Sequence, residues 1–173
     1  MSPVTTHQPQ PGDFFLTIIG GWKGRAVQIG QWLNGDGWSD WQHAGLYLGN
    51  GEIIEAEPGR DGARIVPLSN YDDAPIAWSS WPLTAAQRAR VCAEGRALEH
   101  TRYAWLGYVA IALHRLHIPA PRLRKYIADS RMLICSQLVD EAYHRAGIEL
   151  FRDGRWPGDV TPADLGHVLE GPA

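Results

Sequence analysis

Residues 43–56 have the sequence HAGLYLGNGEIIEA, and this stretch decides the first half of the fold. An apolar run covers residues 44–48, the turn signal GNG follows, and residues 52–56 alternate in polarity as a strand does. Two short strands joined in this way are typical of an antiparallel β-hairpin, because glycine and asparagine adopt the positive φ angles that tight turns need. The stretch therefore predicts a hairpin with His43 at its start.

Glu55 is a carboxylate on the otherwise apolar second strand of this hairpin. Burying a carboxylate costs free energy unless it is paired, and the facing imidazole of His43 is a suitable partner. A carboxylate bonded to one ring nitrogen fixes the tautomer and orientation of an imidazole, as the third member of a catalytic triad does. Glu52 and Glu57 are local alternatives for this role, but both lie nearer the strand ends and are expected to be solvated.

Apolar runs on both sides of the hairpin predict further strands. Residues 14–19 are a β-branched and aromatic run bounded by glycines. Residues 63–68 and 74–81 are also strand-like, and Pro67 and Pro82 place their ends at sheet edges or exits. The first half of the chain is thus predicted to form a small, mostly antiparallel sheet.

After residue 84 the hydrophobic period changes from that of strands to that of helices. Thr84 is a good N-cap for a helix over residues 84–100, and residues 103–116 continue as a second helix. Residues 135–146 have an apolar helical face, and a short helix begins near Thr161. A sheet followed by helices predicts an α+β fold.

The composition indicates one folded domain. With 173 residues, 45% of them hydrophobic and 20% charged, the chain can bury a core and differs from disordered chains. Residues 1–12 contain three prolines and no periodicity, which predicts a flexible N-terminal arm, and residues 13–173 are predicted to form the domain. The absence of a repeat period argues against solenoids and propellers.

The N-terminus lacks the basic and apolar segments of a secretory signal, which favours a cytoplasmic location. The longest uncharged apolar run, residues 103–113, is shorter than the about 20 residues of a membrane-spanning helix, so no transmembrane segment is expected and peripheral membrane contact stays open. The net charge is −3. The chain has one group of basic residues that could bind nucleic acid, but it is more typical of a solvated surface: Arg122, Arg124, Lys125 and Arg131. Nucleic acid is therefore not an expected partner, and no oligomeric state is indicated.

The two cysteines, Cys92 and Cys135, are too few for a disulfide framework and form no CxxC metal motif. Cys135 falls in the first turn of the predicted helix 135–146, where unpaired N–H groups and the helix dipole lower the pKa of a thiol. A partly exposed thiolate there is a candidate nucleophile, whose own N–H can help to hold an oxyanion. By position alone, Cys135 is equally a small buried core residue, and Cys92 is expected to be buried within a helix.

Together these motifs resemble the NlpC-type papain-like peptidases: a histidine, an apolar strand, a glycine turn and a polar residue twelve positions on, in residues 43–55. In those enzymes the cysteine helix precedes this motif, whereas here ICSQLVDEAYHRAG, residues 134–147, follows it. This order is similar to that of the circularly permuted papain-like family of YiiX and YebB type. PGDFFL, LTAAQRARVCAEGRALEHTRYAWLGYVAIAL and TPADL also resemble elements of that family, so the resemblance spans residues 11–169.

The resemblance implies a permuted papain-like fold, in which a small antiparallel β-barrel or sheet packs against helices. It also implies Cys135 as nucleophile, His43 as general base and acid, and Glu55 as the residue that orients His43. The implied reaction is hydrolysis of an amide or ester bond through a thioester acyl-enzyme, without a cofactor. Cell-wall peptides and acyl lipids are the substrate classes it suggests. Residues 20–41 match no element of the family and are expected to build one wall of the cleft.

Two alternatives to a hydrolase remain open. One is a non-catalytic module that binds a peptide or an acyl chain in the same cleft, although an intact Cys, His and Glu set argues against it. The other is a zinc site built from the same three residues, which lacks a fourth ligand. His114 and His117 could chelate a metal at i, i+3 spacing, but they are interpreted as polar groups at a helix end, so no metal is predicted. Four nearby tryptophans are candidates for either an apolar groove or the core: Trp22, Trp32, Trp38 and Trp41.

Overall fold

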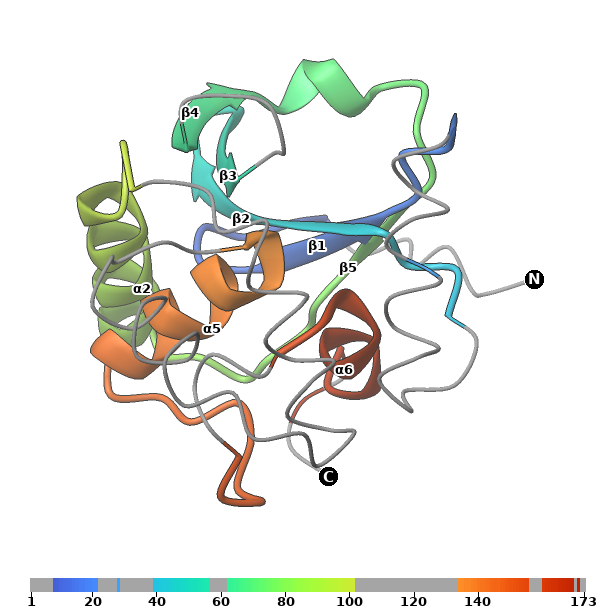
Figure 1. Cartoon of the computed structure of the whole chain (residues 1–173). Helices are drawn as coiled ribbons and strands as arrows, with labels where there is room; N and C mark the ends of the chain where they lie inside the picture. Colours follow the sequence, from blue (N-terminus) through green and yellow to red (C-terminus); the bar gives the residue numbers. More distant parts are fainter. Residues whose placement is uncertain are drawn as a thin grey trace.

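Five antiparallel strands and three α-helices make up the part of the chain that the structure, a computed structural model, describes (Figure 1). That part consists of residues 8–21, 28, 39–56, 62–101, 134–155, 160–169 and 171. It is an α+β fold, as the sequence predicts. Several predictions lie outside the described residues: the helix 103–116, the basic cluster, residues 1–7 of the arm, Glu57, His114, His117, Trp22, Trp32 and Trp38.

The strands form one sheet in the order β4-β3-β2-β1-β5. Their bounds are Phe14–Thr17 (β1), His43–Gly49 (β2), Glu52–Ala56 (β3), Ala63–Pro67 (β4) and Ile76–Trp78 (β5). The 3₁₀-helix η1, Leu68–Tyr71, lies between the two edge strands in the chain. Within the described ranges β4 and β5 do not pair, so these strands form an open sheet and not a closed barrel.

The hairpin predicted for residues 43–56 is formed by β2 and β3. Its turn residues Gly49, Asn50 and Gly51 have φ angles of 89°, 55° and 74°, which explains the choice of glycine and asparagine there. In the register of this pair, Gly45 lies opposite Glu55. His43 and Glu55 therefore share one face of the sheet as diagonal neighbours.

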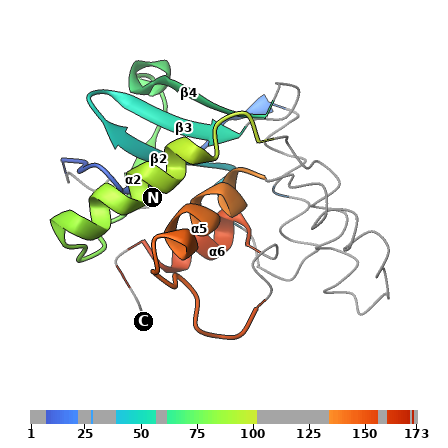
Figure 2. The same ribbon diagram turned by 90° about the vertical axis from the view of Figure 1, so that its left-hand side faces the viewer.

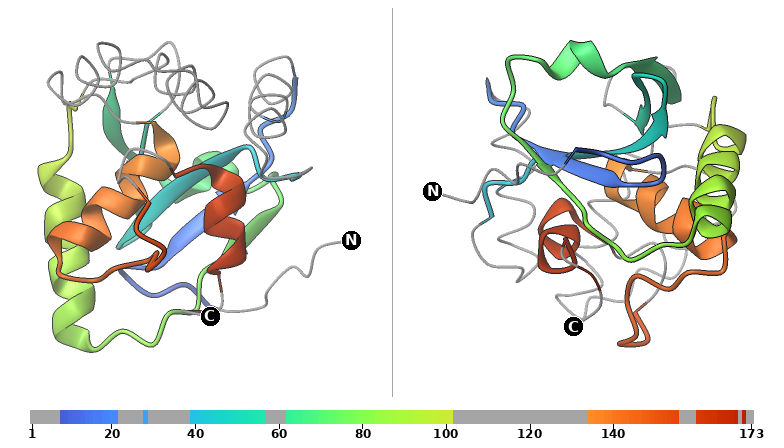
Figure 3. Two further views of the ribbon diagram at one scale, coloured as in Figure 1. Left: turned by 60° about the horizontal axis from the view of Figure 1, so that its bottom comes forward. Right: turned by 180° about the vertical axis from the view of Figure 1, so that it is seen from behind.

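The helices pack on one face of the sheet, and η1 lies over the other (Figures 1 and 3). Figure 2 shows the three helices side by side beneath the strands. Thr84 caps α2 through a reciprocal hydrogen-bond pair with Gln87, and Thr161 caps α6 in the same way with Asp164. Their bounds are Ala85–Ala97 (α2), Cys135–Arg145 (α5) and Pro162–His167 (α6). No helix in the described ranges is long and apolar enough to cross a membrane.

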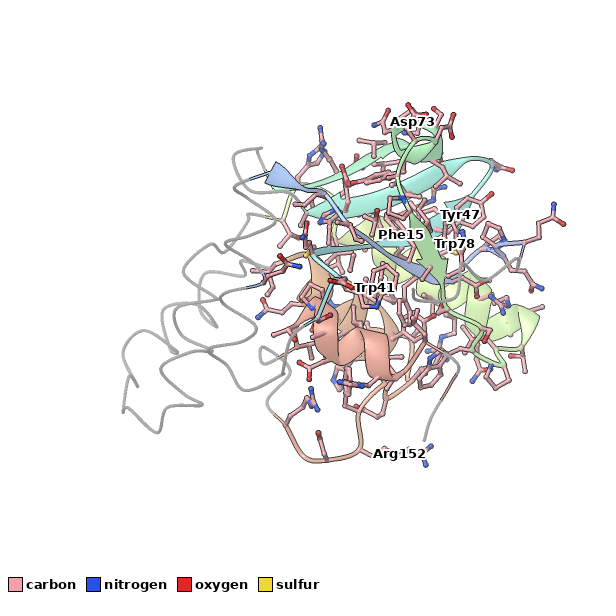
Figure 4. The ribbon with its side chains drawn as sticks, turned by 90° about the vertical axis from the view of Figure 1, so that its right-hand side faces the viewer. Phe15, Trp41, Tyr47, Asp73, Trp78 and Arg152 are labelled. Carbon is pink, nitrogen blue, oxygen red and sulfur yellow. The ribbon has the colours of Figure 1, made fainter. Side chains whose placement is uncertain are left out.

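Successive side chains along each strand point to opposite faces of the sheet, and both faces carry buried apolar residues. The face toward the helices holds the main core, which includes Phe14, Leu16, Leu46 and Ile54. The face toward η1 holds a smaller aromatic cluster, of which Phe15, Tyr47 and Trp78 are drawn in Figure 4. His43 and Glu55 belong to this second face, at the edge of the aromatic cluster.

The end of the predicted N-terminal arm is anchored to the domain. The N–H of Gly12 donates to the carbonyl of Tyr47 at 2.8 Å, and the hydroxyl of Tyr143 on α5 donates to the carbonyl of Gly12 at 2.6 Å. These two bonds connect the residues before β1 with both the sheet and the helix that begins at Cys135.

Candidate active site

Cys135, His43 and Glu55 lie together in the structure. His43 is the first residue of β2, Glu55 lies on β3, and Cys135 is the first residue of α5. The Nε2 atom of His43 is 3.0 Å from Oε2 of Glu55, and the side chain of Cys135 hydrogen-bonds to His43. Because Glu55 engages Nε2, the Nδ1 atom is left for Cys135. The imidazole therefore bridges the carboxylate and the thiol.

A glycine next to this bridge lets an aromatic ring support it. An added Cβ at Gly45 would lie 2.5 Å from the ring of Phe15, so no side chain fits there. Phe15 packs edge-on against His43, with ring centroids 6.5 Å apart. The absence of a side chain at residue 45 thus gives Phe15 the space that it needs beside the imidazole.

All three side chains are buried, with exposed fractions of 1% for His43, 1% for Glu55 and 2% for Cys135. Of the two alternatives left open for Cys135 by its position, the structure shows the buried one, because the apolar face of α5 packs on the sheet and brings Cys135 into the main core. The expectation that Glu55 is buried and paired is confirmed. Glu52 on the same strand is half-exposed and pairs with Arg96 at 2.7 Å, as a solvated alternative should.

Two residues that the sequence did not single out hold the carboxylate of Glu55. Arg64 donates from Nη2 to Oε1 at 2.8 Å, and the hydroxyl of Tyr71 donates to Oε2. Arg64 lies directly opposite Glu55 in the β3–β4 register. The sequence predicts the strand that contains Arg64, but the pairing with Glu55 follows only once the register of the two strands is known. Tyr71 comes from η1, and no periodicity in the sequence connects it with Glu55.

Tyr71 also contacts the imidazole. Its ring stacks on His43 with centroids 6.1 Å apart and an interplanar angle of 16°. The histidine ring is thus held by a stacked ring, by the edge-on ring of Phe15, and by bonds at both nitrogens. These contacts fix both the plane and the direction of the imidazole.

The electrostatics of the site favour a charged histidine. Burial by itself lowers the pKa of His43, but the hydrogen bonds with Cys135 and Glu55 outweigh it and raise the pKa to about 10. Burial raises the pKa of Glu55, but the bond from His43, the bond from Tyr71 and the charge of Arg64 lower it to about 2. At neutral pH the site therefore holds an imidazolium against a carboxylate, and the imidazolium favours the thiolate form of Cys135.

The N-terminus of α5 also favours negative charge at Cys135. The N-cap residue is Ile134, whose apolar side chain supplies no acceptor to the first turn of the helix. The N–H groups of that turn and the helix dipole stabilise an anion placed beside them. The sulfur of Cys135 belongs to the first residue of this helix end.

A cavity of about 360 Å³ opens beside His43 and Glu55. Its walls come from the residues after β1, from β4 and from η1, and they include Ile18, Ile19, Arg64, Asn70 and Tyr71. β1 ends two residues before its predicted end, because the N–H of Ile19 bonds to the side chain of Gln42 at 3.1 Å. Ile18 and Ile19 thereby leave the sheet and line the cavity.

Trp41 does not belong to this cavity. It packs against the main core, where an added Cβ at Gly166 on α6 would lie 2.9 Å from its ring (Figure 4). Trp41 is therefore a partly buried residue at the main core and does not line this cavity.

The geometry does not favour a zinc site. In the described part of the chain, no group of three or more His, Cys, Asp and Glu side chains is placed to hold a metal ion. The two nitrogens of His43 face Glu55 and Cys135 in different directions, so the three groups do not converge on one point as zinc ligands do.

Iodoacetamide at pH 6 is expected to alkylate Cys135 at least about tenfold faster than Cys92, because only a thiolate reacts at an appreciable rate. Cys92 is half-buried on α2, and burial raises the pKa of its thiol despite the charges of Arg96 and Arg88. Peptide mapping of the labelled protein over time measures both rates. The preference should disappear in His43→Ala, and equal labelling of the two thiols in the native protein would remove Cys135 as the nucleophile.

No protein-family model matches the chain, and no curated protein matches it either.

Proposed function

We propose that this protein is a cysteine hydrolase with a circularly permuted papain-like fold. Cys135 is its nucleophile, His43 its general acid and base, and Glu55 the residue that orients His43. The observation that carries the proposal is the imidazole of His43, bonded to Glu55 on Nε2 and to Cys135 on its other side. Nucleophilic catalysis by a thiol needs a base in contact with the sulfur and a third group that orients the base.

In the acylation step, the Sγ atom of Cys135 attacks the carbonyl carbon of an amide or ester. The C–S bond forms, and the carbonyl oxygen becomes an oxyanion beside the N–H of Cys135 at the start of α5. The bond to the leaving nitrogen or oxygen then breaks, and the His43 imidazolium gives its proton to that atom. The products are a thioester on Cys135 and a free amine or alcohol.

In the deacylation step, the neutral His43 takes a proton from a water molecule whose oxygen attacks the thioester. The C–S bond breaks, the carboxylic acid leaves, and the thiolate and the imidazolium are restored. Glu55 stays ionised throughout, because Tyr71 and Arg64 both donate to it. It stabilises the imidazolium and keeps the other nitrogen directed at the sulfur.

The order of the elements supports the permuted assignment. The strands that carry His43 and Glu55 come first, and the helix that begins at Cys135 follows them in the chain. The permuted family resembled by the motifs has this order, and its members suggest amide bonds of peptides or acyl bonds of lipids as substrates.

The test is a mass spectrum of the protein after treatment with p-nitrophenyl acetate and with peptide esters, quenched in acid. The native protein should carry the acyl group on Cys135, and Cys135→Ala should carry none while still binding the substrate. Pretreatment with a chelator should leave acylation and turnover unchanged. Ligand binding without an adduct or turnover would favour the non-catalytic module, and activity that a chelator removes and Zn²⁺ restores would favour the metal site.

A further inference from the structure

Asp140 is a buried carboxylate that the proposed reaction does not use. It lies on α5, five residues after Cys135, and its exposed fraction is 8%. Among the residues that the structure describes, none forms a hydrogen bond or an ion pair with its side chain. Buried carboxylates are normally paired, because removing an unpaired charge from water costs much free energy. This site therefore favours the neutral, protonated form of Asp140.

Asp140 lies on the face of α5 that meets the segment before α6. Ser136 is one turn earlier on the same face of the helix, and its hydroxyl donates to the carbonyl of Val160 at 2.6 Å. α5 and α6 lie side by side in Figure 2. The position of the Asp140 side chain is thus tied to the docking of α5 on its neighbours.

The charged groups on α5 and directly after it do not neutralise Asp140. His144 is one turn further along the helix, but it pairs with Glu149 at 2.9 Å. Glu149 and Glu141 both add negative charge near Asp140. The cation on this side is therefore bound by another carboxylate, and the nearby anions oppose ionisation of Asp140.

The described charged groups on the other elements packed against α5 are also paired. Arg155, in the segment before α6, attracts Asp140 but pairs with Asp153 at 2.6 Å and with Asp164 of α6 at 2.8 Å. α2 and the sheet contact the apolar face of α5, and the buried charges they bring there bind each other: Arg88 with Asp13 at 2.6 Å, and His43 with Glu55 at 3.0 Å.

These surroundings set the pH range in which Asp140 ionises. Burial raises its pKa from 3.8 to about 7, and the charges of Glu149 and Glu141 act in the same direction, against those of His144 and Arg155. The docked helix therefore binds this proton more tightly than an exposed helix does. The stability that the proton gives is fully present below about pH 4, decreases as the pH rises, and is lost above about pH 7.

We propose that Asp140 is a proton-dependent switch in the docking of α5: its protonated carboxyl group stabilises the docked helix, and its ionised carboxylate weakens the docking. Because α5 begins at Cys135, the switch acts on the helix that holds the thiol against His43 without contacting the imidazole. The inference goes beyond the proposed function and does not depend on it, since it concerns how firmly α5 is docked.

The experiment is amide hydrogen exchange of α5 at pH 5 and pH 7.5 in the native protein and in Asp140→Asn, with protection factors corrected for intrinsic exchange rates. Asparagine has nearly the same shape and carries no charge at either pH. Between these pH values, the protection of α5 should fall at least about tenfold further in the native protein than in Asp140→Asn. Both proteins share the titration of His43 and Glu55, so those contributions cancel in the comparison.

Asp72→Asn is the matched control. Asp72 is an exposed carboxylate directly after η1, which lies over the other face of the sheet. Its substitution should leave the native difference between pH 5 and pH 7.5 unchanged.

A second measurement reads the proton directly in the native protein. Ordinary Asp and Glu side chains are ionised at pH 6, so an infrared band of a protonated carboxyl group at this pH reports a raised pKa. The band should disappear as the pH rises through about 7, and it should be missing from Asp140→Asn but present in Asp72→Asn. It also decides the matter if Asp140→Asn does not fold.

Equal falls in the protection of α5 in the native protein and Asp140→Asn would overturn the switch. Absence of the carboxyl band from the native protein at pH 6 would do the same. Neither result bears on the acylation of Cys135, which tests the proposed function separately.

Discussion

His43→Ala is expected to lower kcat/KM for hydrolysis by about 10²- to 10⁴-fold, the range typical for loss of a general base. In the proposed mechanism, the substitution removes the group that protonates the leaving atom and deprotonates water, and it also removes the side-chain hydrogen bond between His43 and Cys135. Steady-state hydrolysis of the ester that acylates Cys135 measures the effect. Circular dichroism and thermal unfolding of the variant show whether the fold is retained.

His144→Ala is the matched control for this loss. His144 lies on α5, is half-exposed, and pairs with Glu149 at 2.9 Å, away from the imidazole of His43. Its substitution should leave kcat/KM unchanged. A folded His43→Ala protein that keeps the native rate to within a few-fold would exclude His43 as the acid and base.

Glu55→Gln should retain measurable turnover but move the alkaline limb of kcat/KM to lower pH. In the native protein, burial lowers the pKa of His43, and the bonds with Cys135 and Glu55 raise it to about 10. A neutral glutamine removes part of the raising contribution, so the pKa of His43 falls. The imidazolium that protonates the leaving group in the proposed mechanism is then lost at a lower pH. The native limb should lie near pH 10, and that of the variant closer to neutrality.

The measurement is kcat/KM from pH 5 to pH 11 for the native protein, Glu55→Gln and the control Glu52→Gln. Glu52 is half-exposed and pairs with Arg96 at 2.7 Å, so its substitution should leave the profile in place. An alkaline limb that stays unchanged in Glu55→Gln would show that Glu55 does not act on His43. If Glu52→Gln lowered kcat/KM more than Glu55→Gln does, Glu52 and not Glu55 would be the residue that orients His43.

The local parts of the fold could be predicted because their signals lie within short segments. The turn at residues 49–51, the N-caps Thr84 and Thr161, and the helix that begins at Cys135 each depend on neighbouring residues. The pairing of His43 with Glu55 also follows from a local feature, since both lie on one hairpin and alternation puts them on one face.

The remainder of the site depends on contacts between distant segments. Arg64 reaches Glu55 through the register of β4 on β3, and Tyr71 reaches it because η1 lies over the sheet. The burial of Cys135 depends on how α5 packs against the sheet. The hydrophobic pattern predicts that such strands and helices exist, but it specifies neither the register between strands nor how closely a helix packs on the sheet. The contacts of Arg64 and Tyr71 with Glu55, and the burial of Cys135, could therefore not be predicted from the sequence.

The positions of the three residues along the chain also bear on how the protein folds. His43 and Glu55 are twelve positions apart on one hairpin, whereas His43 and Cys135 are separated by 92. Closing a long loop costs more chain entropy than closing a short one, and contacts between distant segments limit folding rates. The ion pair of the hairpin can therefore form before α5 has docked, but the contact between sulfur and imidazole requires the docked helix. A newly synthesised or unfolded chain carries a cysteine of ordinary reactivity at position 135, and on the proposed function its activation requires the completed tertiary structure.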